Sequence, residues 1–274
     1  MFSAKPYVEQ TDPPRSPRET LPTMYDLPSE DPNEPGLPDE YHYLQPQLLS
    51  ATFRLSDYAT DEVFTAGDLN IYYDVRHPLW HKRPDWFAVV GIPRLYDQQD
   101  LRLSYVMWQE GVSPTVVVEL LSPGTEDEDL GRTERETNSR PPTKWDVYEQ
   151  ILRVPYYVVF NRYTDRLQAF TLVAGQYQEL DLPEPRIWMP MLNLGLGLWH
   201  GEQRGITRQW LRWYDAEGNW IPTEAEQVEQ ERQQRQQAQQ QAEQERQQRQ
   251  QAQQRADQLA ERLRSLGVDP DAVD

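Results

Sequence analysis

Short apolar runs separated by polar and turn-forming residues recur along the chain between residues 39 and 222. Runs of four to eight residues that are rich in Val, Ile, Tyr and Phe are typical of β-strands. We therefore predict strands at "LNIYYD" (69–74), "WFAVV" (86–90), "LSYVMW" (103–108), "VVVELL" (116–121), "YYVVF" (156–160) and "LQAFTLV" (167–173). The aromatic stretch "WLRWYDAEGNWIP" (210–222) predicts a closing hairpin with its turn at "EGN".

Two segments within this region have helical patterns. "EYHYLQPQLLSATF" (40–53) predicts a helix that Pro46 interrupts or kinks. "PPTKWDVYEQILR" (141–153) begins with a capping box, because Thr143 can cap the helix and Asp146 follows three residues later.

The second helix has a predicted buried stripe formed by Tyr148, Ile151, Leu152 and Pro155, which are spaced i, i+3, i+4 and i+7. Lys144 lies four residues before Tyr148 and therefore at the upper end of the same stripe. A lysine there either extends to solvent or points at an interior acid. Strands, this helix and a further strand follow one another, which predicts a mixed α/β core.

The composition changes abruptly after Pro222. "ERQQRQQAQQQAEQ" (231–244) recurs almost unchanged as "ERQQRQQAQQRADQ" (245–258), a repeat of two heptads. Its residues are good helix formers, but Ala layers alternate with Arg and Glu layers, and only Leu259, Leu263 and Leu266 are strong seam residues. We expect one helix over about 223–266 that projects from the domain. Both a coiled coil and a single solvated helix remain open.

The chain therefore divides into three predicted regions. Residues 1–38 contain nine prolines and many acids without apolar periodicity, which predicts an extended, largely disordered arm. Residues 39–222 form the domain, and residues 223–274 form the Gln/Arg/Glu-rich tail.

Composition narrows the classes of protein to consider. The 274 residues include no cysteine, which excludes disulfides and thiolate metal sites. No apolar run reaches the roughly 18 residues of a membrane span, and "MFSAKPYVEQ" does not resemble a signal peptide. We expect a cytoplasmic protein without a membrane partner.

The formal net charge of −18 argues against a general nucleic-acid binder. Residues 1–40 contain nine acids and three bases, however, so about a third of the excess lies in the leading segment. Only Lys5, Lys82 and Lys144 are lysines among 27 basic residues, so the two interior lysines are candidates for a specific role.

Glu119 lies inside the most strand-like apolar run of the chain, where a carboxylate needs compensation. Asp85 opens another predicted strand. Two carboxylates on adjacent strands would repel one another unless a cation lay between them, and Mg²⁺ prefers such oxygen ligands. A nearby lysine could orient a water molecule or hold a phosphate.

Simpler interpretations exist for each residue: Asp85 as a turn residue before a strand, Glu119 as an exposed acid on an edge strand, and Lys144 as an ordinary helix-start lysine. His77 and His81 lie in a loop with Pro78, which argues against a zinc-binding helix turn. The glycines of "LGLGLWHG" (194–201) lack the context of a phosphate-binding loop.

"PD" at residues 84–85, "VVVELLSPGT" (116–125) and then Lys144, Tyr148 and "VPYYVVF" (154–160) resemble the PD-(D/E)XK nuclease superfamily. Within it, the sequence is most similar to the Uma-type group of bacterial restriction endonucleases, over about residues 39–200. The resemblance implies an α/β (α+β) fold of the restriction-endonuclease type, with a mixed central sheet flanked by helices.

The resemblance also implies a site. Asp85 and Glu119 would bind Mg²⁺ or Mn²⁺ with the backbone carbonyl of Leu120 as a third ligand, and Glu40 would be the first-helix glutamate found in many members. The superfamily usually places its lysine two residues after the acid, but that position is Leu121 here. The Uma-type group takes its lysine from the following helix, where Lys144 stands. The polar insertion 126–142 precedes that helix.

We therefore expect a metal-dependent endonuclease that hydrolyses phosphodiester bonds in DNA, with catalytic residues Asp85, Glu119 and Lys144. The alternative is a catalytically inactive binding or assembly module that keeps the fold and uses its C-terminal helix to join partners. A homodimer through the core or through that helix is compatible with both.

Overall fold

The computed structural model describes residues 13–23, 25–27, 39–121, 126–132 and 141–266. It divides the chain into two compact units, Met1–Ile221 and Pro222–Asp274.

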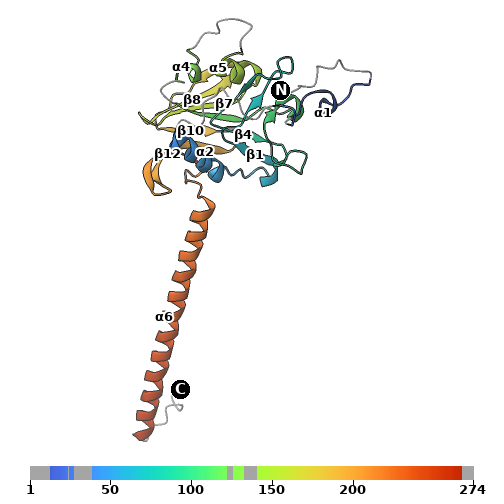
Figure 1. The fold of residues 1–274 in the computed structure, drawn as a ribbon. Coiled ribbons are helices and arrows are strands. Elements are labelled where there is room, and N and C mark those ends of the chain that lie inside the picture. The colour runs from blue at the N-terminus through green and yellow to red at the C-terminus, as the bar shows by residue number, and fades with distance from the viewer. Residues whose placement is uncertain (1–12, 24, 28–38, 122–125, 133–140, 267–274) are drawn as a thin grey trace. The chain divides into compact units, whose positions relative to one another are not determined.

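A six-stranded sheet forms the centre of the first unit, in the order β1-β4-β6-β7-β8-β9 (Figure 1). β6 and β7 are parallel, and every other neighbouring pair is antiparallel. The strands are β1 (Val63–Ala66), β4 (Trp86–Val90), β6 (Val116–Leu120), β7 (Tyr156–Asn161), β8 (Arg166–Val173) and β9 (Gln176–Glu179).

Strand β6 is buried along its whole length because its two faces pack into two different hydrophobic clusters. Val116, Val118 and Leu120 point to one cluster, whereas Val117 points to the other. Alternate residues of a strand face opposite sides of a sheet, so Glu119 shares the face of Val117.

One face of the central sheet is covered by α2 (Glu40–Thr52) and by a second sheet, β10-β11-β12 (Figure 1). Gln45 docks the helix on this sheet, because its buried amide donates to the Leu211 carbonyl and accepts from the Leu211 amide, both at 2.8 Å. The strands are β10 (Arg186–Met189), β11 (Leu194–Gln203) and β12 (Ile206–Tyr214).

The opposite face carries a short helix, α5 (Lys144–Asp146), which continues as a π-helical turn, η2 (Val147–Ile151). A small sheet in the order β3-β2-β5 packs into the same cluster. The remaining elements of this unit are α1 (Pro17–Thr20), η1 (Thr60–Glu62), β2 (Ile71–Tyr72), β3 (His81–Lys82), β5 (Tyr105–Val106), α3 (Met107–Glu110) and α4 (Glu126–Asp129).

These elements confirm the mixed α+β class and the central strands expected from the sequence. The expected strands 69–74 and 103–108 shorten to the two-residue strands β2 and β5. The expected hairpin 210–222 is reduced to the end of β12 and a turn that brings Trp220 to Tyr214. β1, β3 and β9–β11 were not expected.

The glycine-containing stretch 194–201 belongs to strand β11, which agrees with the absence of a phosphate loop. A Cβ atom on Gly195 would lie 2.0 Å from the Tyr214 ring, so glycine is needed there for aromatic packing.

Part of the leading segment packs on the first unit. The Trp108 indole donates to the Pro22 carbonyl at 2.7 Å, and the Gln109 amide donates to the Pro17 carbonyl at 2.7 Å. Residues 1–12, 24 and 28–38 of the expected arm lie outside the described residues.

The second unit contains α6 (Glu224–Ser265), which agrees with the helix expected over about 223–266. Thr223 and Glu226 form a capping box at its start, and none of its residues is buried. No helix in the described part of the chain is long and apolar enough to cross a membrane.

Candidate active site

Asp85 and Glu119 lie opposite one another on neighbouring strands. Trp86 of β4 pairs with Val118 of β6 in antiparallel register, so the residue before Trp86 faces the residue after Val118. The Asp85 amide donates to Glu119 Oε2 at 3.4 Å, and Asp85 Oδ2 accepts from the Leu120 amide at 2.6 Å. The sheet therefore brings both acids to one place on one face.

Glu119 is fully buried, and the helix packed over its strand supplies its partners. The Tyr148 hydroxyl donates to Glu119 Oε1 at 2.8 Å. Lys144 Nζ donates to Glu119 Oε2 at 3.1 Å. Glu119 is thus not an exposed edge-strand acid, because β6 lies between β4 and β7.

Both the backbone and the side-chain amine of Lys144 are fixed in position. Its backbone stands at the first position of α5, where Thr143 and Asp146 form the expected capping box. Its amine lies between Glu119 Oε2 and Asp129 Oδ1, the latter at 2.9 Å. Asp129 is 1% exposed, so the amine is enclosed by two buried carboxylates.

Burial dominates the electrostatics of this cluster. It raises the pKa of Glu119 well above its ordinary value; the charge of Lys144 opposes this shift, and Asp129 and Asp85 add to it. Burial likewise raises the pKa of Asp85, against Lys144 and the Leu120 amide. Burial alone would lower the pKa of Lys144, but Glu119, Asp129 and Asp85 outweigh it and raise that pKa well above its ordinary value.

The donor set of the two acids fits a hard divalent cation. Two carboxylates whose pKa values are raised by burial and by nearby acids favour either a bound proton or a bound cation. Asp85 is half-buried as a residue and is therefore the less deeply buried of the two acids. Within the described residues, no group of three or more His, Asp or Glu side chains is placed to bind one metal ion. A cation at the acid pair would therefore complete its coordination shell with water, as Mg²⁺ commonly does.

The Leu120 carbonyl, expected as a third ligand, already accepts a hydrogen bond. His42 Nε2 lies 2.9 Å from this oxygen, and His42 Nδ1 lies 2.9 Å from Asp39 Oδ1. A carbonyl oxygen has two lone pairs, so a cation would have to use the second one.

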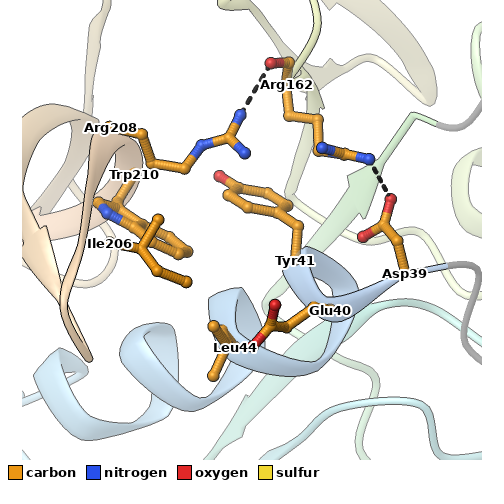
Figure 2. A pocket seen from close by; sticks show the side chains of 8 residues that line it. All are labelled: Asp39, Glu40, Tyr41, Leu44, Arg162, Ile206, Arg208 and Trp210. Carbon is orange, nitrogen blue, oxygen red and sulfur yellow. Dashed lines mark hydrogen bonds and ion pairs between the residues drawn. The ribbon is translucent and has the colours of Figure 1, made fainter.

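Glu40 lies elsewhere. It is exposed at the start of α2 and lines a surface pocket together with Tyr41 and Arg208 (Figure 2). The residue of this helix that reaches β6 is His42, two positions later. The other interior lysine, Lys82, pairs with Glu128 at 3.0 Å.

Sequence reasoning missed Asp129 and His42. Asp129 belongs to a run of four acids, "EDED" (126–129), whose pattern is that of a solvated segment, and nothing in that run distinguishes its last member. A signal for His42 was present, because Asp39 and His42 are spaced i, i+3 at a helix start, where an Asp cap can also bind a side chain.

The chemistry available at this place is therefore that of two carboxylates, an ammonium group and a tyrosine hydroxyl on one sheet face. Such a set can hold a cation and place a positive charge beside a phosphate or a water molecule. It offers no thiol, and burial raises the pKa of the Tyr148 hydroxyl well above its ordinary value, which disfavours tyrosine as the nucleophile.

Comparison with known proteins agrees with this architecture. A search of curated proteins gives no match for this sequence. The family model Uma2, described as "Putative restriction endonuclease", matches residues 21–209, which is more than half of the chain and includes β4, β6 and α5. The chain therefore belongs to the Uma2 family of restriction-endonuclease-like proteins.

Proposed function

We propose that the protein is a metal-dependent endonuclease that hydrolyses phosphodiester bonds in DNA, in the cytoplasm, with Mg²⁺ or Mn²⁺ as its cation. The observation that carries the proposal is the placement of Asp85 opposite Glu119 with the Lys144 amine 3.1 Å from the Glu119 carboxylate. Membership in a family of restriction-endonuclease-like proteins supports the nuclease class.

In this proposal Asp85 and Glu119 hold the cation, with the Leu120 carbonyl as a further ligand. The cation, when bound, lowers the pKa of a coordinated water and offsets charge on the phosphate. Tyr148 orients Glu119 through its hydrogen bond at 2.8 Å. Lys144 keeps its proton and lies close enough to orient the attacking water or to bind a phosphate oxygen.

The test is cleavage of supercoiled and linear DNA by purified protein with Mg²⁺, with Mn²⁺ or with a chelator. We expect metal-dependent nicking or cleavage that Asp85→Asn and Glu119→Gln abolish, a loss of at least about 100-fold, since removal of key catalytic groups commonly costs this much. Circular dichroism must show that both variants fold. Equal activity in Glu119→Gln would identify a contaminating nuclease or a different site.

The alternative is a non-cleaving assembly module, and a specific observation favours it. α6 is a 42-residue helix without a buried residue. Such a helix adds nothing to the core of a catalytic domain, but it offers a long surface for binding a partner. Calorimetry with Mn²⁺ separates the two functions, because the enzyme must bind the cation through Asp85 and Glu119. Absence of both metal binding and cleavage in the folded protein would favour the assembly module.

A further inference from the structure

A pocket of about 290 Å³ lies at the start of α2, near the ends of two strands (Figure 2). Arg162 directly follows β7, and Arg208 belongs to the first half of β12. The lining residues are Asp39, Glu40, Tyr41, Leu44, Arg162, Ile206, Arg208 and Trp210.

Arg208 is held in a fixed position by aromatic packing. Its guanidinium lies 4.5 Å from the centre of the Tyr41 ring, which in turn stacks on Trp210 at 5.0 Å (Figure 2). Its Nη2 donates to the Arg162 carbonyl at 2.9 Å. A guanidinium fixed over an aromatic ring keeps its planar fork available for a bidentate acceptor such as phosphate.

Arg162 and Arg208 differ in whether an acidic side chain pairs with their positive charge. Arg162 forms an ion pair with Asp39 at 2.5 Å. Arg208 has no ion pair with an acid among the described residues, and its Nε is buried there without a hydrogen-bond partner, as is that of Arg162. Because this Nε is buried, a ligand would have to meet the outer nitrogens of the Arg208 guanidinium, and the unpaired positive charge there favours an anionic acceptor.

Asp39 does not pair with Arg208, because its two carboxylate oxygens face Arg162 and His42. His42 Nδ1 faces the Asp39 carboxylate and Nε2 faces the Leu120 carbonyl, both at 2.9 Å. The acid left to oppose Arg208 in the pocket is the exposed Glu40.

The pocket is connected to the acid pair. Arg162, Asp39, His42 and the Leu120 carbonyl form a continuous chain of contacts, and Leu120 directly follows Glu119. β6 and β7 are parallel, with Leu120 paired to Phe160, so Arg162 and Glu119 lie at the same end of neighbouring strands. The pocket lies on the α2 face of the sheet and the acid pair on the α5 face, so a polynucleotide that met both places would cross the sheet at this end of β6 and β7.

We propose that Arg208, with Arg162 beside it, binds a backbone phosphate of a nucleic-acid strand whose scissile phosphodiester lies at Asp85 and Glu119. This inference rests on the proposed nuclease function and adds to it the contact that anchors the strand. Phosphate contacts of this kind position a strand without reading its sequence, and they make binding dependent on salt.

The test is the affinity of the full-length protein for fluorescently labelled double-stranded and single-stranded DNA, measured by anisotropy with EDTA over a series of NaCl concentrations. We expect Arg208→Gln to weaken binding about 10-fold, the order for one charge-assisted contact. The slope of log affinity against log salt should fall in magnitude by about one. Arg208→Lys should lose less, because it keeps the charge.

Two further variants separate a lost contact from a damaged fold. Arg76→Gln removes the same charge from an arginine whose side chain is 82% exposed outside the pocket, and it should leave affinity unchanged. Glu40→Gln removes the acid that opposes Arg208, so it should tighten binding about two- to fivefold, of the order of one screened charge interaction. A gain of affinity cannot arise from misfolding.

Unchanged affinity and salt slope in both Arg208→Gln and Glu40→Gln would overturn the phosphate contact, even if the protein cleaves DNA. Inorganic phosphate serves as the second probe. If phosphate stabilised the protein through Arg208 while Arg208→Gln left the affinity for DNA unchanged, the pocket would bind free phosphate. That result would overturn the nucleic-acid assignment. Metal-dependent cleavage by the unaltered protein, measured in parallel, tests the proposed function separately.

Discussion

Glu119 shows how a single residue can indicate a site from the sequence alone. An acid inside "VVVELL" conflicts with the burial that the run predicts, and the fold places it in full burial against Lys144 and Tyr148. Asp129 shows the limit of this reasoning. Its carboxylate is as deeply enclosed, but its neighbours in sequence are acids, and only the tertiary packing of α4 on α5 distinguishes it.

The raised pKa of Glu119 predicts that the stability of the metal-free protein falls as pH rises. Above the ordinary value of 4.5 the unfolded chain has released this proton while the folded protein still holds it. The folded state then binds more protons, so the free energy of unfolding decreases with pH, by at most about 1.4 kcal/mol per pH unit for one proton. Thermal melts from about pH 5 to about pH 8 measure this slope.

Glu119→Gln should flatten that slope, because glutamine does not titrate. Mg²⁺ should raise the melting temperature of the unaltered protein most at the upper end of the range, because the cation competes with the proton. The idea fails if the slopes of the two proteins coincide, or if Mg²⁺ stabilises Glu119→Gln equally.

Lys144 predicts a large difference in stability between two lysine variants. Lys144→Met leaves the Asp129 carboxylate buried without its cation and removes a hydrogen-bond donor from Glu119, which should cost about 3–5 kcal/mol. Lys82→Met is the matched control, because its partner Glu128 is 40% exposed, and it should cost about 1 kcal/mol or less. Urea denaturation measures both free energies of unfolding.

A third variant tests the enclosure of the amine. Asp129→Asn leaves Lys144 its contact with Glu119 and should therefore cost less than Lys144→Met. Combining the two should recover part of the loss, because the buried Asp129 charge is then gone. Equal costs for Lys144→Met and Lys82→Met would mean that the Lys144 amine is not an enclosed counter-ion.

At the scale of elements, the sequence predicts correctly those features that depend only on residues close together in the chain. Thr143 and Asp146 form the capping box as expected, because a cap involves only residues three apart. The stripe that follows was wrong at one position: Ile151 is 44% exposed. The helix widens into a π-turn at Val147–Ile151, which rotates the next residue relative to an α-helical pattern and still buries Leu152.

The second sheet could not be predicted in the same way. β11 alternates glycine with larger residues, and its glycines are explained only by partners distant in sequence or by aromatic rings on the same face, such as Tyr214 over Gly195. Glycine weakens a strand signal in isolation. The sequence therefore indicated the strands that carry the acids, which are continuous apolar runs, and missed those whose stability depends on packing between sheets.

At the scale of the whole molecule, the two units differ in burial. The first unit has a large buried core, whereas no residue of α6 is buried. α6 spans about 63 Å at 1.5 Å per residue, and its apolar residues Val228 and Leu259 are each 65% exposed, as is Leu266 directly after the helix, at 72%. Intrahelical ion pairs, such as Arg249 with Glu245 at 3.2 Å, and the cap at Thr223 stabilise it locally.

We therefore predict that truncation after Pro222 leaves the melting temperature of the remaining protein within about 2 °C, because no buried apolar surface is removed and surface changes usually cost little. Self-association, if the helix mediates it, should concentrate at Leu259, Leu263 and Leu266, the strongest seam residues. Light scattering should then give a smaller mass for the truncated protein and for a variant with these three leucines changed to serine. A truncated protein that fails to fold, seen by circular dichroism, would show instead that the helix is integral to the domain.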